Sequence, residues 1–405
     1  MIKDISKYVL KNFLTNLTRS SLTIVSITIG IMAIFALLSF GQGLTKYVDD
    51  IAEDMGVDNI IVMGRGYPFV SPEDSLTNED VDFLKNLGRV YNVAPFMGNI
   101  VEVQREEGGQ RRYITLAAMS TKPGELEFSQ RMYAEFAVEE GRDLQRNARG
   151  EAVIGHNYRI PGKVFDRPLE VGDRIFINGE SFRIVGFFPP IGNPQDDTSV
   201  IISIADAEEL FGIENQYQMV YLRGHEGDPP KEVADYVQEE LRRFKNEDVG
   251  EESFTVQTFE SLFEMFDQIF ALINGIVVAL ASISIFVAAV NIANSMYTSV
   301  LERTKEIGIM KALGARNSYI ASIFMAEAGL LGLIGGALGV LLGYIIATIG
   351  GNIVDAAGYG MLSPYFPLWL IIGCLLFAFT VGSLSGFFPA LQASRLKPVD
   401  ALREE

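Results

Sequence analysis

Residues 301–315 read L-E-R-T-K-E-I-G-I-M-K-A-L-G-A and lie between two long apolar segments. The stretch holds three basic and two acidic side chains, and ionised groups are costly inside a bilayer. It is also too short to form a domain of its own. We therefore expect it to lie on the water side of a membrane, to contact a partner there, and to connect two helices that cross the bilayer.

The segment before this stretch is a long apolar helix pattern. Residues 268–301 contain no charged side chain over 34 positions, and the helical pattern begins earlier, at 261. At ~1.5 Å per residue, about 40 residues span about 60 Å, roughly twice the hydrocarbon thickness of a bilayer. The segment 261–301 is therefore predicted to be a second membrane span with a stalk that projects from the membrane.

The N-terminal region predicts an interfacial helix followed by a first span. Lys3, Lys7, Lys11 and Arg19 alternate with apolar residues at helical spacing, and an uncharged apolar run follows. A cleaved signal peptide is the alternative. It is disfavoured because the apolar run is long, starts late and is followed by no A-x-A site.

Two further spans follow the opening stretch. The third contains overlapping G-x-x-x-G spacings, which let helices approach closely; these glycines are Gly332, Gly335, Gly336, Gly339 and Gly343. Glu327 is an intramembrane acid near the start of this span, where it either holds residues 301–315 in place or carries ions. The fourth span ends before a tail of mixed charge.

The region between the first two spans is different in character. Its charges are frequent and its apolar runs are short, which predicts a large α+β domain with its own core. Asn178-Gly179 between two strand patterns predicts a hairpin. Residues 125–195 are interpreted as a subdomain inserted into a frame formed by the flanking parts, and Asp196-Asp197 as a solvated loop.

The sequence therefore predicts a membrane protein with four transmembrane α-helices and a large α+β extracytoplasmic domain inserted between helices one and two. The predicted segments are a cytoplasmic amphipathic helix at 1–20, the first span at 21–44, the extracytoplasmic domain at 45–260, the stalk and second span at 261–301, a cytoplasmic loop or short helix at 302–317, the third span at 318–354, an outer link at 355–367, the fourth span at 368–391 and a cytoplasmic tail at 392–405.

Composition excludes several classes of function. The net charge is −18, and the acidic excess lies between residues 45 and 267, which argues against nucleic acid as a partner. Cys374 is the single cysteine, and His156 and His225 are far apart, so we expect no metal site. The chain contains no G-x-x-x-x-G-K-[ST], H-E-x-x-H or G-x-S-x-G motif. We therefore expect no catalytic residues, and no ATP hydrolysis through a phosphate-binding loop of this chain.

Basic residues decide the predicted orientation. Four Lys or Arg residues lie in the N-terminal segment, four lie in 302–316 and three lie in the tail, whereas the link between spans three and four has none. By the positive-inside rule, both termini and residues 301–315 are cytoplasmic, and the large domain is outside. The predicted location is the cell membrane, with the bilayer itself as a partner.

Two motifs make a family resemblance specific. E-R-T-K-E-I-G-I-M-K-A-L-G-A at 302–315 is similar to the signature between transmembrane helices two and three of MacB/FtsX/LolE-type ABC transporter permeases. P-A-L-Q-A-S-R-L-K-P-V-D-A-L at 389–402 resembles the same family's end motif, and G-Q-G at 41–43 fits its first span. The order of one span, a large outside domain and three spans also agrees, and the resemblance covers the whole chain.

The resemblance implies a permease subunit with a MacB-like periplasmic core domain. It implies a homodimer whose cytoplasmic loops dock on a separate ABC ATPase, which would hold the ATP and Mg, with no cofactor in this chain. Motion would pass through the loop to the outer domain by mechanotransmission, and an extracytoplasmic adaptor or substrate protein is a further partner. We call residues 301–315 the coupling segment. Its expected ATPase contacts and turn residues are Glu302, Arg303, Thr304, Glu306, Gly308, Lys311, Gly314 and Ala315, with Gly308 and Gly314 setting sharp turns.

Three functional classes follow. The first is export or extraction of a peptide, lipoprotein or hydrophobic drug by the ATP-driven permease. The second is an FtsX-like signalling scaffold that activates an extracytoplasmic cell-wall enzyme without transport. The third is a membrane receptor without an ATPase. The size of the predicted outside domain favours the first class over the second.

Overall fold

The computed structural model describes residues 17–55, 58–65, 75–132 and 137–397. Most of the predicted helix at 1–20 therefore lies outside the described residues. The chain divides into two compact units, which we describe separately. The helical unit comprises Met1–Thr45, Ile269–Ile353 and Leu362–Glu405, and the sheet unit comprises Lys46–Gln268 and Val354–Met361.

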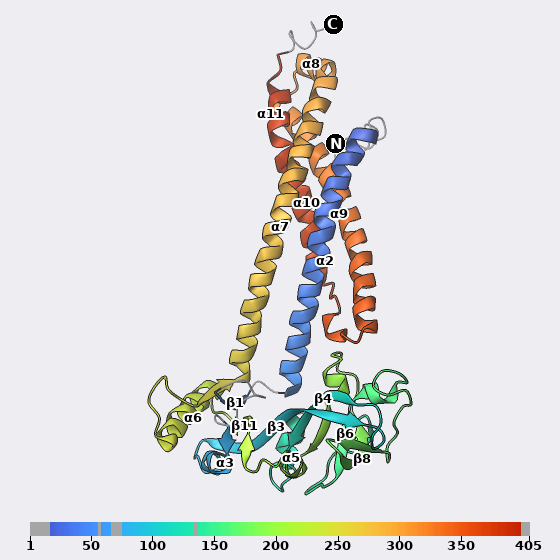
Figure 1. The fold of residues 1–405 in the computed structure, drawn as a ribbon. Coiled ribbons are helices and arrows are strands. Elements are labelled where there is room, and N and C mark those ends of the chain that lie inside the picture. The colour runs from blue at the N-terminus through green and yellow to red at the C-terminus, as the bar shows by residue number, and fades with distance from the viewer. Residues whose placement is uncertain (1–16, 56–57, 66–74, 133–136, 398–405) are drawn as a thin grey trace. The chain divides into compact units, whose positions relative to one another are not determined.

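Four helices are long and apolar enough to cross a membrane, among the residues that the structure describes. They are α2 (Leu17–Met55), α7 (Phe259–Glu302), α9 (Asn317–Ala356) and the pair α10 (Leu368–Ser385) and α11 (Phe387–Arg395). Figure 1 shows them as the long elements of one bundle, with the short helix α8 (Thr304–Ala312) between α7 and α9 in the chain.

The fourth apolar segment is not the single uninterrupted helix that the sequence predicted over 368–391. α10 ends at Ser385, Gly386 separates it from α11, and Pro389 lies in the first turn of α11. A proline inside a continuous helix lacks an N–H and its ring collides with the carbonyl four residues earlier, whereas a first turn tolerates it. The break at Gly386 gives Pro389 this tolerated position.

Glycines of α9 pack two other helices closely. A Cβ on Gly335 would lie 2.8 Å from the Cβ of Ile27 in α2, and one on Gly339 would lie 2.8 Å from the Cβ of Ile31. Gly343 also meets α2, at Met32 and Phe35, whereas Gly332 and Gly336 meet Ala378 of α10. The G-x-x-x-G spacings thus serve two faces of one helix, because residues four apart share a face.

Polar contacts also fix α2 within the helical unit. The hydroxyl of Thr28 donates to the carbonyl of Gly335 at 3.1 Å. The amide of Asn291, in α7, donates to the hydroxyl of Ser26 at 3.1 Å. Each bond gives a polar side-chain donor a partner in an apolar environment.

The sheet unit is built on a ten-stranded, mostly antiparallel sheet. Its main order is β12-β1-β11-β3-β4-β9-β6-β8-β5, with β7 paired to β3 and β8. The strands are β1 (Asn59–Gly64), β3 (Val90–Gln104), β4 (Arg112–Met119), β5 (Glu140–Gly141), β6 (Glu151–Ile154), β7 (Arg174–Ile177), β8 (Glu180–Phe187), β9 (Val200–Ser203), β11 (Met219–Gly224) and β12 (Phe254–Thr258); β2 (Leu76–Thr77) and β10 (Gln216–Tyr217) pair separately.

Helices α3 (Asn78–Lys85), α4 (Leu126–Met132), α5 (Ile204–Phe211) and α6 (Pro230–Lys245) complete the sheet unit. A core of Ile, Val, Leu and Phe side chains runs from β1 to β8 and includes the inner faces of α3 and α6. The predicted inserted subdomain at 125–195 forms one end of this same sheet, since β7 pairs with β3 and β6 with β9. It is therefore not a separate body.

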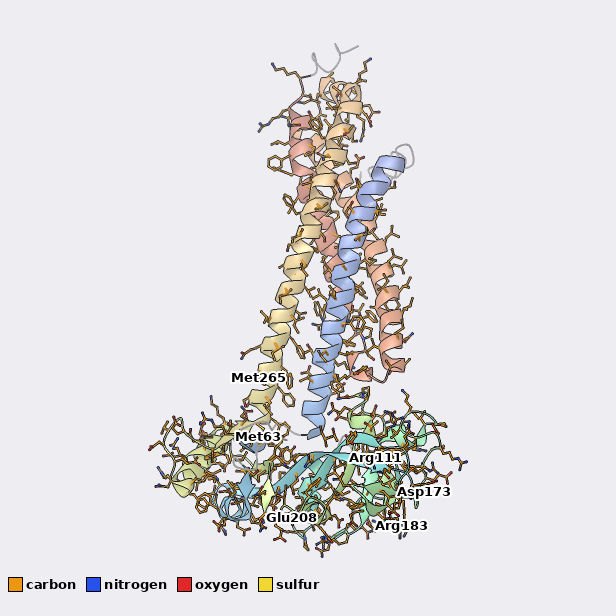
Figure 2. The ribbon with its side chains drawn as sticks, viewed as in Figure 1. Met63, Arg111, Asp173, Arg183, Glu208 and Met265 are labelled. Carbon is orange, nitrogen blue, oxygen red and sulfur yellow. The ribbon has the colours of Figure 1, made fainter. Side chains whose placement is uncertain are left out.

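Two local features of the sheet unit follow directly from the sequence. β7 and β8 form the predicted hairpin, and both Asn178 and Gly179 have positive φ, as its tight turn requires. Charged side chains cover the surface, and Figure 2 labels Arg111, Asp173 and Arg183 among them. The segment 354–361 clusters with this unit, and its residues 355–361 were predicted as part of an outer link; Met361 N–H donates to the Gly192 carbonyl at 3.2 Å.

The sequence predicted a solvated loop at Asp196-Asp197, and the structure contradicts this at Asp197. Asp197 is 4% exposed, and its carboxylate accepts a hydrogen bond from the Ile191 N–H at 2.6 Å. Burial raises the pKa of Asp197, although bonds from Ile191 and Gly192 and the charges of His156 and Lys163 oppose this. The carboxylate shapes the loop by holding its backbone.

Candidate functional site

The coupling segment begins where α7 stops. α7 ends at Glu302, and Arg303 leaves the helical conformation, with φ −109° and ψ 16°. α8 then runs from Thr304 to Ala312. The Thr304 hydroxyl donates to the carbonyl of Leu301 at 2.9 Å and approaches that of Val300 at 3.2 Å. These bonds satisfy carbonyls that the end of α7 leaves without a helical partner.

The two predicted turn glycines have different positions. Gly314 has φ +90°, the left-handed region that favours glycine, directly after the end of α8. The Gly314 N–H donates to the Lys311 carbonyl, and the Ala315 N–H donates to the Met310 carbonyl. Gly308, in contrast, lies buried inside α8, so its predicted role in a turn is wrong.

Arg303 and Glu327 come together across the unit. The Arg303 guanidinium lies 3.0 Å from the Glu327 carboxylate in α9, and both side chains are 12% exposed. The same guanidinium contacts Glu306 at 3.2 Å and lies 5.2 Å from the centre of the Phe324 ring. Two roles were left open for Glu327, which were holding the coupling segment in place and carrying ions. The contact with Arg303 supports the first.

Lys311 also bonds within the chain. Its ammonium donates to the carbonyl oxygens of Ser394 at 2.6 Å and Leu396 at 2.7 Å, at the end of α11. The last carbonyls of a helix have no helical partner and carry partial negative charge, so a cation is favourable there. The sequence predicted Lys311 as an ATPase contact. In the structure, its ammonium donates to two carbonyls of the same chain.

Two exposed apolar side chains that the sequence analysis missed lie on α8 and just after its end. Ile309 is 52% exposed and Leu313 is 84% exposed, and their four-residue spacing places them on one helix face. Exposed charged residues precede and follow them in the chain; these are Glu302, Lys305, Glu306 and Arg316. We call these six residues the docking face. The spacing of Ile309 and Leu313 was a signal in the sequence, but Ile307 has similar character and is fully buried.

Comparison with known proteins agrees with the fold. The model of the MacB-like periplasmic core domain matches residues 20–240, and the model of the FtsX-like permease C-terminal domain matches residues 278–398. The second match contains the coupling segment, Glu327 and α11. The two matches together include most of both structural units.

Relatives along the full chain carry the same description. An uncharacterised ABC transporter permease of Methanocaldococcus jannaschii, MJ1507, is 35% identical over all of this chain and 98% of its own length. The ABC transporter permease YknZ of Bacillus subtilis is 26% identical over 98% of each chain. The macrolide export ATP-binding/permease protein MacB of Marinobacter nauticus is 28% identical, and this chain spans 60% of its length.

Among solved structures, the periplasmic region of MacB from Actinobacillus actinomycetemcomitans aligns with 53% of this chain and 95% of its own, at a TM-score of 0.42 and 10% identity. The family assignment rests on the sequence matches instead. Four apolar helices, the matched domains and a relative that is 35% identical over the full length agree. This multi-pass membrane chain belongs to the ABC transporter permeases that combine a MacB-like periplasmic core domain with an FtsX-like permease domain.

Proposed function

We propose that this permease receives ATP-driven motion from a separate ABC ATPase at the docking face and passes it to the sheet unit by mechanotransmission. One observation carries the proposal: Ile309 of α8 and Leu313 just after it are exposed, and exposed charged residues precede and follow them in the chain. Protein interfaces concentrate binding energy in central apolar anchors, with a polar rim that excludes water.

The proposed motion passes from the coupling segment to the sheet unit through one continuous helix, with no loop between that helix and the sheet. α7 follows β12 directly, since the strand ends at Thr258 and the helix begins at Phe259. The Thr258 hydroxyl accepts from the Ser261 N–H at 3.0 Å and so caps the first turn. β12 pairs with β1 over five positions, from Ile60↔Thr258 to Gly64↔Phe254. A helix of 44 residues, about 66 Å long at ~1.5 Å per residue, thus connects the coupling segment to a central sheet.

The proposed orientation places both termini and the docking face in the cytoplasm and the sheet unit outside the cell membrane. The distribution of basic residues supports this orientation. Fusion of a fluorescent reporter that fails to fold outside the cytoplasm tests it. Fluorescence from fusions at 405, and none from fusions inserted at the exposed Asn178-Gly179 turn, is the expected pattern; the reverse would overturn the orientation.

The proposed cargo is a peptide, lipoprotein or hydrophobic drug that is exported or extracted at the outer side. The MacB relative is named a macrolide export protein, which supports a hydrophobic small molecule within this range. Two copies of the chain form the proposed assembly, with an adaptor or substrate protein at the sheet unit. Mass spectrometry of the complex released from lipid would count the copies. Vesicle uptake of labelled cargo would separate transport from the scaffold alternative, in which ATP is hydrolysed and nothing moves.

The docking face is tested by placing a charge at each apolar anchor. Ile309→Asp and Leu313→Asp should each lower the amount of ATPase that co-purifies with the permease at least tenfold, because a buried unpaired carboxylate in an interface is costly. ATP hydrolysis stimulated by the permease should fall with it.

Ile100→Asp is the matched control. Ile100 lies in β3 and is 61% exposed, so it offers the same chemical change on the sheet unit. This variant should retain the ATPase. Equal co-purification of ATPase with all three variants would exclude α8 as the docking element.

A further inference from the structure

Two cations of the coupling segment bond to other helices of the helical unit. Arg303 pairs with Glu327 of α9 at 3.0 Å, and Lys311 bonds to two carbonyls at the end of α11. Lys305 of α8, in contrast, is exposed. The basic residues of this short segment therefore differ in environment.

Arg303 stands at the joint between α7 and α8. Its N–H reaches back to the carbonyl of Ser299 at 3.2 Å, so its backbone belongs to the end of α7. Its guanidinium lies against Glu306 in the first turn of α8, and against Glu327 and the Phe324 ring in α9. One side chain thus connects three helices at the point where the backbone bends. The planar, forked guanidinium is suited to several partners at once.

Lys311 makes the corresponding connection at the other end of α8. Its two acceptors, the carbonyls of Ser394 and Leu396, lie on the last turn of α11 and just beyond it. Arg303 and Lys311 are eight positions apart, about 12 Å along a helix at ~1.5 Å per residue. Ile309, an anchor of the docking face, lies between them in the chain.

We infer that Arg303 and Lys311 are positioning residues that clamp α8 at both ends, so that motion of α8 reaches α9 and α11 as well as α7. This inference rests on the proposed function for the source of the motion, but the clamp itself is a property of the permease alone. A force on the docking face is then shared among three membrane helices. Without the clamp, α8 would move as a hinged arm attached only through the backbone.

Hydrogen exchange of the full chain in lipid nanodiscs, without ATPase, tests the clamp. Glu327→Gln and Lys311→Met should each raise the exchange rate of α8 amides about tenfold, since each removes a charge-assisted hydrogen bond that opposes local opening. Lys305→Met is the control, because it removes an exposed cation of the same helix and should leave exchange unchanged. Unchanged exchange in both Glu327→Gln and Lys311→Met would overturn the inference.

A double variant tests whether Arg303 and Glu327 act as a pair. Removing both charges, with Arg303→Gln and Glu327→Gln together, should raise exchange less than the product of the two single effects, because neither partner remains as an unpaired buried charge. Multiplicative effects would show that the two residues act separately, against the clamp.

Measurements with the partner ATPase distinguish residues that position α8 from residues that contact the ATPase. In Glu327→Gln and Lys311→Met, ATPase affinity should stay within about twofold while stimulated hydrolysis falls about tenfold, the loss expected for one charge-assisted bond. Loss of affinity with normal turnover would make these residues contacts and overturn the inference. If Ile309→Asp left ATPase binding intact while the exchange results held, the proposed function would fail and the clamp would stand.

Discussion

Gly335 of α9 lies so close to Ile27 of α2 that a methyl group on the glycine would come within 2.8 Å of the Ile27 Cβ. The same site contains the bond from the Thr28 hydroxyl to the Gly335 carbonyl. Close backbone approach and this hydrogen bond therefore depend on each other. In lipid, where apolar burial contributes little between helices, such packing is a main source of helix association.

Gly335→Ala should destabilise the helical unit. The added methyl group has no room, and overpacking costs about 1–3 kcal/mol. Gly373→Ala is the matched control, because a Cβ at Gly373 in α10 meets nothing within 4 Å; it should be neutral or stabilise slightly, since alanine favours a helix over glycine. Thermal unfolding in a mild detergent compares the two. Equal midpoints would contradict close packing at Gly335.

Substitution of Gly314 should destabilise the turn after α8, and the size of the effect should depend on the residue introduced. Its φ of +90° costs alanine about 1–2 kcal/mol, whereas asparagine adopts left-handed conformations more readily. Gly314→Ala should therefore increase proteolytic cleavage after α8 more than Gly314→Asn does. Limited proteolysis followed by mass spectrometry measures the order. A larger effect of Asn than of Ala would contradict the turn geometry.

Lys245 should stabilise the sheet unit more than its neighbour Arg243 does. Lys245 of α6 lies 3.1 Å from the carboxylate of Asp80, whose side chain is 3% exposed and also caps α3. Lys245→Met leaves that buried carboxylate without its cation and should cost about 1–3 kcal/mol.

Arg243→Met provides the comparison on the same helix. Arg243 is 63% exposed and pairs with Glu239 and Glu240 on the surface, where such pairs contribute about 0–1 kcal/mol. Urea unfolding followed by the near-ultraviolet signal measures both variants. A loss for Arg243→Met as large as that for Lys245→Met would contradict the difference in burial.

Asp197 should make stability depend on pH. Burial raises its pKa in the folded chain above the ordinary value, so the folded state holds this proton more tightly than the unfolded state does. Its contribution to stability is therefore present below the ordinary pKa and declines as pH rises through the raised one. Asp197→Asn should remove this decline, which lies in the pH range above the ordinary Asp pKa of about 3.9.

Unfolding midpoints measured over this pH range test the prediction for Asp197. Asp173→Asn is a control for the removal of one carboxylate from the same unit. Identical profiles for Asp197→Asn and the natural chain would contradict the effect of burial.

The sequence by itself determined the membrane helices, the α+β domain between the first two, and the coupling segment. These features depend on long uncharged runs, on spacing and on turn residues such as Asn178-Gly179, all of which act locally. The apolar run at 368–391 was interpreted as one helix, although Gly386 and Pro389 both disfavour a continuous helix there; the structure places the break at Gly386.

Tertiary structure decided how the coupling segment is used. The sequence showed five charged residues in 301–315 but not which of them would find a partner inside the chain. Glu327 lies 24 positions from Arg303, and the acceptors of Lys311 lie more than 80 positions away, so packing of α9 and α11 against α8 selected these pairs. The same packing buried Ile307 and left Ile309 and Leu313 exposed, because burial depends on which helix face meets a neighbour, and apolar character alone does not fix that face.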